Sequence, residues 1–199
     1  GNLENLGTID FTNAADFAVP SNGAANINFS GTTANTSIAF NAGSSTTFYG
    51  FTSNKQTNYE LSLIASASST VKFVNNGYTV NALGNGILRF GTNITIDRLI
   101  GNASGNYDIG SPMSLPVFWI DGANVTYNAT GAIVPYGTIR ITSGTLTCLA
   151  GQGGIVIRES GLILVDGGTI NARMIRTSVT AVTHRGTYIQ NAGTVTLSG

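Results

Sequence analysis

The chain has 199 residues, of which only 9% are charged, against about 25% in an ordinary soluble domain. Nine basic residues balance nine acidic ones, so no net field attracts nucleic acid or an anionic membrane surface. A hydrophobic share of 42% supplies enough apolar surface for a packed core and excludes disorder. No run of residues approaches the ~20 apolar positions of a membrane helix, so membrane insertion is not expected.

Short alternations of apolar and polar residues, bounded by Gly, Asn or Ser, run along the chain, and no window has helical periodicity. They predict strands at 26–29, 70–74, 86–90, 93–96, 138–141, 154–158, 162–165 and 194–197. Residues 1–116 are less regular than 117–199. Residues 101–116 are expected to form a projecting loop, because Pro112 and Pro116 cannot lie in a central strand. Residues 172–185 are expected to form a second insertion.

Glycines recur at a spacing of seven residues, which fits one short strand and the bend that ends it. Three segments align without gaps at this spacing: 137–148, 154–165 and 186–197. A Gly-Thr signature recurs at Gly144, Gly168 and Gly193, in steps of 24 and 25 residues. Three such strands and bends make one coil, so the repeats predict coils of roughly 20–25 residues.

The fold expected from these repeats is a right-handed parallel β-helix, a single solenoid segment over 1–199. Inward Leu, Ile and Val would stack into apolar columns, and outward Thr and Asn would form hydrogen-bonded ladders along the axis. An antiparallel β-sandwich is the alternative, because many short strands with turn signals are also typical of that architecture.

Several pieces of the second half resemble secreted bacterial surface β-solenoids exported with a C-terminal sorting domain. They are 118–123, 137–140, 167–171, 175–178 and 184–186, and the ending 193–199 is similar to autotransporter-associated strand repeats. The resemblance covers roughly 117–199. It implies a right-handed parallel β-helix in an extracellular stalk or adhesin-like protein, and it carries no catalytic residues over.

The acidic residues are scattered singly, and none forms the close pair that glycosidases use or the acidic calcium cluster of lyases. Cys148 is the only cysteine, so the chain has no internal disulfide and no cysteine-based metal site. It lies in a strand-like run, 36 residues from His184, and is expected to be a small buried core residue. Neither catalysis nor a cofactor is expected.

Basic residues gather in the second insertion, as Arg173, Arg176, His184 and Arg185. They are candidates for binding an anionic glycan. The favoured interpretation is that these charges are solvated and pair with Glu159 and Asp166, because structural ion pairs are common on protein surfaces.

Aromatic residues gather around the predicted loop and the coil after it, as Tyr107, Trp119, Tyr127 and Tyr136. Exposed aromatic rings stack on the apolar faces of sugars, so Trp119 and Tyr107 are candidate sugar-binding residues. Phe118 is expected in the core, and the position of Trp119 is left open.

The leading functional hypothesis is a non-catalytic structural and adhesive segment of a large secreted or cell-surface bacterial protein. Both chain ends look like cuts within a pattern, so a larger parent polypeptide is expected, with an extracellular glycan or host surface as partner. The alternative is a carbohydrate-active or glycan-binding β-helix domain. An ice-binding face is a third hypothesis: two rungs, Thr145/Thr147 and Thr194/Thr196, are intact, Thr169/Asn171 is mixed, and Arg140 interrupts an adjacent run.

Overall fold

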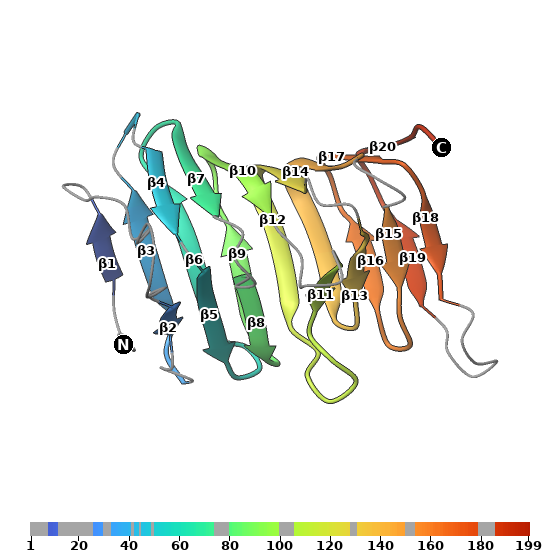
Figure 1. Cartoon of the computed structure of the whole chain (residues 1–199), viewed down its shortest axis with the longest axis horizontal. Coiled ribbons are helices and arrows are strands. Elements are labelled where there is room, and N and C mark those ends of the chain that lie inside the picture. Colours follow the sequence, from blue (N-terminus) through green and yellow to red (C-terminus); the bar gives the residue numbers. More distant parts are fainter. Residues whose placement is uncertain are drawn as a thin grey trace.

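The computed structural model is a parallel β-helix whose coils stack along one axis (Figure 1). It describes residues 8–11, 26–29, 33–40, 42–43, 45–48, 50–73, 80–99, 106–127, 131–149, 154–178 and 186–199. Every pairing between the strands of these residues is parallel, which confirms the β-helix and excludes the antiparallel sandwich. No helix among the described residues has the length and hydropathy to cross a membrane.

The described strands lie on three faces of the solenoid. The first face contains β1 (Thr8–Phe11), β3 (Thr36–Phe40), β6 (Glu60–Ala65), β9 (Ile87–Phe90), the first parts of β12 (Val117–Tyr127) and β14 (Thr138–Cys148), β16 (Leu162–Val165) and β19 (Thr187–Gln190). The second contains β4 (Ser45–Phe48), β7 (Ser69–Phe73), β10 (Ile94–Leu99), the last parts of β12 and β14, β17 (Thr169–Ala172) and β20 (Thr194–Leu197).

The third face consists of two sheets. The first sheet holds β2 (Asn26–Phe29), β5 (Gly50–Lys55) and β8 (Val80–Gly84). The second holds β11 (Tyr107–Ile109), β13 (Ile133–Pro135), β15 (Ile155–Ile157) and β18 (Ile175–Thr177). The strands predicted from sequence all fall on observed strands.

The core is built from columns of like side chains that lie on top of one another. Strand alternation sends every second side chain inward, and parallel in-register pairing places it over its counterpart in the previous coil. One first-face column runs through Ile38, Leu63, Phe90, Ile120, Ile141 and Val165, all of them fully buried. Burying one such side chain stabilises the fold by about 1.5–3 kcal/mol, so the columns hold the coils together.

Aromatic rings and the single cysteine also lie in this core. The Phe118 ring is 4.7 Å from that of Phe90 and 6.0 Å from that of Tyr107, centre to centre, which confirms Phe118 as a core residue. Cys148 is buried as expected, and its thiol donates to the carbonyl of Gly154. Burial raises the pKa of the Cys148 thiol and keeps it protonated.

Glycines occupy the corner between the first and second faces. Gly144, Gly168 and Gly193 all have positive φ, at 84°, 66° and 79°. They also lie on one another: a Cβ on Gly193 would come within 2.6 Å of the Gly168 carbonyl oxygen, and one on Gly168 within 2.7 Å of that of Gly144. The bend therefore requires glycine for both its backbone conformation and its close stacking.

The gap-free alignment of three repeats is wrong for its middle member. Leu162 pairs with Thr138, and its N–H donates to the Gly137 carbonyl, so Gly161 and not Gly154 is the counterpart of Gly137. The strand after Gly154 is β15, on the third face. The unit of one strand and its bend occurs three times in each coil. Aligning a third-face strand with a first-face strand therefore still matches glycine with glycine, and the sequence alignment cannot detect the error.

Some coils of the first half are longer than the sequence repeats predict. Thr138 pairs with Leu162, and Leu162 with Thr187, so the last coils keep the spacing of the Gly-Thr signature. The pairings of Leu61 with Leu88 and of Leu88 with Phe118 each span a longer stretch of chain. The extra length lies in the connections between faces, where chain can be added without disturbing the strand register.

Both predicted insertions contain a strand. The segment predicted as a projecting loop at 101–116 includes β11, which pairs with β13 inside the third face, and most of its other described residues form the turn from Gly110 to Leu115. Likewise β18 lies within 172–185 and pairs with β15. Both strands have only three residues, which is too short a stretch to show a clear periodicity in the sequence.

The outward Thr and Asn side chains of the second face do not form the expected ladders. Thr145, Thr169 and Thr194 stack in register, as the spacing of the Gly-Thr signature predicts. None of these hydroxyl groups makes a hydrogen bond with another described residue. The coils are therefore joined by backbone pairing and core columns, and these hydroxyls are available to solvent.

Candidate functional site

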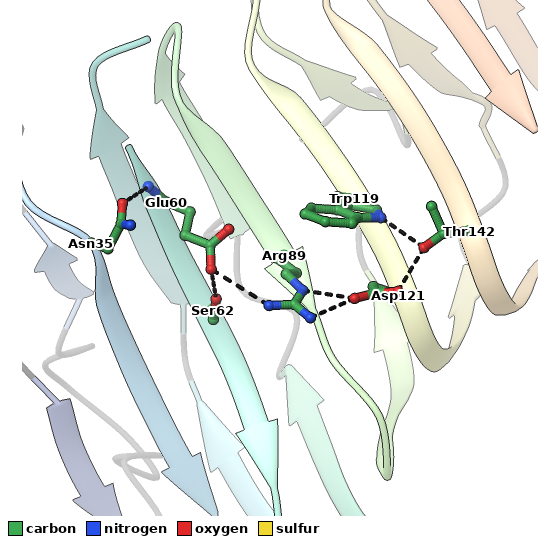
Figure 2. Close-up of polar contacts among 7 residues, drawn as sticks. All are labelled: Asn35, Glu60, Ser62, Arg89, Trp119, Asp121 and Thr142. Atoms are coloured by element: carbon green, nitrogen blue, oxygen red, sulfur yellow. Dashed lines mark hydrogen bonds and ion pairs between the residues drawn. The ribbon is translucent and has the colours of Figure 1, made fainter. Parts of the chain in front are cut away.

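A line of polar side chains crosses the outer surface of the first face from coil to coil (Figure 2). Arg89, Trp119 and Arg140 hold the same position in β9, β12 and β14, which are consecutive strands of this face. Strand neighbours such as Phe118 and Ile120 point inward, so these three side chains point out. We call the whole line the outer ladder: Asn35, Glu60, Ser62, Arg89, Trp119, Asp121, Arg140, Thr142, Asp166 and Asn191.

Trp119, the only tryptophan of the chain, lies between two guanidinium groups. The Cζ atoms of Arg89 and Arg140 are 4.9 and 5.0 Å from its ring centre. β9 and β14 flank β12 on opposite sides, so the two cations approach from the two neighbouring coils. The indole Nε1–H donates to Thr142 Oγ1 at 2.9 Å, which fixes the ring. Both contacts are within the range of cation–π attraction.

Asp121 is the anionic centre of the outer ladder. It accepts hydrogen bonds from Arg89 Nε at 2.9 Å and from Thr142 Oγ1 at 2.6 Å (Figure 2). Partial burial alone raises the pKa of the Asp121 carboxyl, but the hydrogen bonds from Thr142 and Arg89 and the Arg89 charge outweigh it and hold the pKa below its ordinary value. Asp121 is therefore ionised at neutral pH.

Glu60 extends the outer ladder towards the N-terminus. Its Oε1 lies 3.6 Å from an Arg89 guanidinium nitrogen and accepts the Ser62 hydroxyl, while its backbone N–H donates to Asn35 Oδ1 at 2.9 Å. A shallow depression of about 290 Å³ opens beside these groups and is lined by Asn35, Thr36, Ser37, Glu60, Ser62, Ile64 and Arg89. One cation thus lies between two carboxylates at the edge of this depression.

Arg140 continues the ladder towards the C-terminus. Its Nε donates to Asp166 Oδ2 at 3.1 Å, and the Asn191 amide donates to the other oxygen of the same carboxylate at 2.8 Å. The Asn191 hydrogen bond, together with that from Arg140, lowers the pKa of Asp166. At 40% exposure the Arg140 side chain is more accessible than that of Arg89.

Most contacts of the outer ladder join residues that lie one coil apart. The sequence separation is 25 residues from Asn35 to Glu60, 32 from Arg89 to Asp121 and 25 from Asp166 to Asn191. The carboxylates are held by cations and hydroxyls, and the low pKa of Asp121 makes it a poor proton donor for glycoside hydrolysis. No group of three metal-ligating side chains occurs among the described residues.

The structure corrects the role expected for Tyr107. Its side chain is buried, at 1% exposure, and its ring packs 6.5 Å from that of Tyr127, which is also buried, so neither ring offers a face to a sugar. Trp119 does lie on the surface, but guanidinium groups flank its ring. Trp119 therefore does not present an open ring face on which a sugar could stack.

The basic cluster is only partly described. Arg173 and Arg176 are exposed, before and within β18, whereas His184 and Arg185 lie outside the described residues. Asp166 pairs with Arg140 and Asn191, which corrects the expectation that it neutralises the second insertion. Trp119 and Arg176 lie on different faces, so the structure does not bring these two described candidates together.

Sequence reasoning missed the arginines of the outer ladder. The number of residues from Trp119 to Arg140 is the same as that from Asn124 to Thr145. The repeat spacing could therefore have predicted that Arg140 lies beside Trp119. The step from Arg89 to Trp119 is longer than the regular repeat and carries no sequence signal.

The stacked parallel strands define the class of the protein as a parallel β-solenoid. No protein-family model, curated protein or solved structure matches the chain.

Proposed function

We propose that this chain is a non-catalytic structural and adhesive segment of a larger secreted or cell-surface bacterial protein. The observation that carries the proposal is the outer ladder, in which the charged side chains of the first face link successive coils from Asn35 to Asn191. Most of the ladder's polar contacts are thus directed along the solenoid axis.

An axial ladder suits a spacer. Coils of a solenoid contact only their neighbours, so the stack resists bending and slippage only as well as each coil-to-coil interface does. Exposed ion pairs contribute about 0.2–1 kcal/mol each, but each pair also opposes sliding of one coil over the next. A stalk that carries an adhesive surface needs this resistance.

The adhesive partner in this proposal is an extracellular glycan or a host or matrix surface. The supporting features are the outward arginines and the tryptophan edge between them. Guanidinium groups bind carboxylates and sulfates through paired donors. An acidic polysaccharide that displaces the Asp166 contact of Arg140 would fit the more exposed end of this network.

A glycan-binding or carbohydrate-active domain remains the second candidate. It is favoured by one arrangement: Glu60 and Asp121 both contact Arg89, next to Trp119 and the depression of about 290 Å³. The lowered pKa of Asp121 argues against the hydrolytic version, because a general acid needs a raised pKa.

A glycan array beside a reducing-end release assay separates the two candidates. We expect binding of acidic glycans without release of new reducing ends. Arg140→Gln should weaken binding, whereas Arg173→Gln, an exposed arginine away from the ladder, serves as the matched control. Depolymerisation that disappears in Glu60→Gln would refute the non-catalytic proposal and establish the alternative. Binding that is equally sensitive to both arginine variants would remove the ladder from the adhesive surface.

A further inference from the structure

The outward positions of the second face form two parallel columns of small uncharged side chains. The first column stacks through β7, β10, β12, β14, β17 and β20, and the second through the last four of these strands. We call the two columns together the threonine array. Its members are Thr70, Thr95, Asn124, Thr145, Thr169 and Thr194 in the first column and Thr126, Thr147, Asn171 and Thr196 in the second.

The side chains between the two columns point into the core. Val125, Leu146 and Ile170 are at most 1% exposed, so their strand neighbours on both sides point out. None of the array hydroxyls or amides makes a hydrogen bond with another described residue. The array therefore presents free hydroxyl and methyl groups to water, and the core packing beneath it holds them in place.

The array has a regular spacing in two directions. Neighbouring strands of a sheet are about 4.7–4.9 Å apart, and alternate residues of a strand are about 6.6 Å apart. The pairing of β14 with β17 and of β17 with β20 is continuous, without a register shift. No charged residue lies in the four three-residue rungs from β12 to β20, and Arg140 belongs to the first face and does not interrupt them.

We propose that the threonine array is an ice-binding surface. A rigid uncharged lattice complements a partner that is itself uncharged and periodic in two directions. Ice offers such a partner, because its planes repeat water oxygens at separations comparable to those between the threonines. The hydroxyls can hydrogen-bond that water directly or through bridging molecules, while the methyl groups lie against it without competing ion hydration. This inference is independent of the adhesive role proposed for the first face.

Two positions of the array hold asparagine where the other positions hold threonine, and this difference provides a test. Asn124 in the first column and Asn171 in the second carry a planar amide in place of a hydroxyl and a methyl group. Replacing each with threonine leaves the coil geometry unchanged, because threonine suits a strand surface. If the array binds ice, the completed lattice should bind better.

The experiment measures thermal hysteresis and ice-recrystallisation inhibition of the whole chain. We expect measurable hysteresis and faceted ice crystals. Thr147→Lys, at the centre of the array, should lose most of the hysteresis, whereas Thr138→Lys, an outward residue of the first face in the same strand, should keep it. Asn124→Thr with Asn171→Thr should raise the hysteresis severalfold. Circular dichroism confirms that each variant retains the β-helix, and Thr147→Val, which keeps the shape, provides a second reading should the lysine variant misfold.

Three results would overturn the inference. The first is a folded chain that neither lowers the freezing point below the melting point nor shapes ice crystals. The second is an equal loss of hysteresis in Thr147→Lys and Thr138→Lys. The third is retention on insoluble cellulose or chitin, lost in Thr147→Lys and unaccompanied by hysteresis, which would assign the array to a crystalline polysaccharide.

Discussion

Arg89 and Asp121 are far apart in the chain, yet Arg89 Nε donates to Asp121 Oδ2 at 2.9 Å. They meet because β9 and β12 are adjacent, with Phe90 paired to Ile120. Asp121 directly follows Ile120, so its side chain reaches Arg89 in the previous coil. Thr142, one coil further, donates to the other oxygen of Asp121. A single carboxylate thereby connects three coils.

Replacing this carboxylate should weaken the stack. Asp121→Asn removes the charge that Arg89 faces while keeping the size of the side chain. Because both partners are partly exposed, we expect the free energy of unfolding to fall by about 1 kcal/mol. Urea denaturation at low salt measures the loss. In about 1 M salt, where screening is strong, the difference should shrink; a difference independent of salt would show that the charge is not its cause.

The same residue predicts a pH dependence. The folded-state pKa of Asp121 is depressed, so its contribution is complete above the unfolded-state pKa of about 4 and disappears as the pH falls through the lower folded value. Stability should therefore decline below about pH 5. The wild-type chain and Asp121→Asn, compared by thermal melting from neutral to strongly acidic pH, should converge at the acidic end. Parallel curves over the whole range would contradict the assignment.

Trp119 should contribute through its ring as well as its N–H. Trp119→Ala removes two cation–π contacts of about 0.5–1 kcal/mol each and one hydrogen bond of about 1 kcal/mol. We expect a loss of about 2 kcal/mol, with Trp119→Phe recovering roughly half because a ring remains between the arginines. Chemical denaturation followed by circular dichroism compares them. Equal losses for the two variants would mean that the guanidinium–ring contacts contribute nothing.

Glycine stacking at the corner can be separated from backbone strain. Gly168→Ala places a Cβ within 2.7 Å of the Gly144 carbonyl oxygen at a φ of 66°. Gly43 has a similar φ of 72° but open space around it. We expect Gly43→Ala to cost about 1 kcal/mol, the penalty of a left-handed backbone, and Gly168→Ala about 3 kcal/mol because overpacking adds to it. Similar melting temperatures for both variants would contradict the stacking.

The elements that could be predicted are those whose signal is local. Alternation in 138–141 or 194–197 identifies a strand without any knowledge of its neighbours. The regular spacing of Gly144, Gly168 and Gly193 also places the strands that follow them correctly on one another. The alignment of 154–165 with 137–148 is wrong by one face, because the glycine pattern repeats three times within each coil.

The candidate sites depend on which strand lies beside which. Tyr107 and Trp119 are equivalent as aromatic residues in the sequence, yet the first is in the core and the second on the surface. The register of β9 against β12 brings Arg89 to Trp119, and variable connections set that register. Likewise, only the assignment of Arg140 to the first face shows that the threonine array is free of charge.

The sequence by itself determined that the chain is all-β, that it repeats, and that its core consists of stacked aliphatic residues, because alternation and glycine spacing are properties of neighbouring residues. Only the tertiary structure decided that Glu60, Arg89, Asp121, Arg140 and Asp166 belong to one ladder on the first face. It also decided that the threonines stack into an array on the second face. The physical reason is that coils differ in length, since the step from Trp119 to Arg140 is much shorter than that from Arg89 to Trp119. Contacts between coils depend on the summed length of three strands and three bends, and no local pattern encodes that sum.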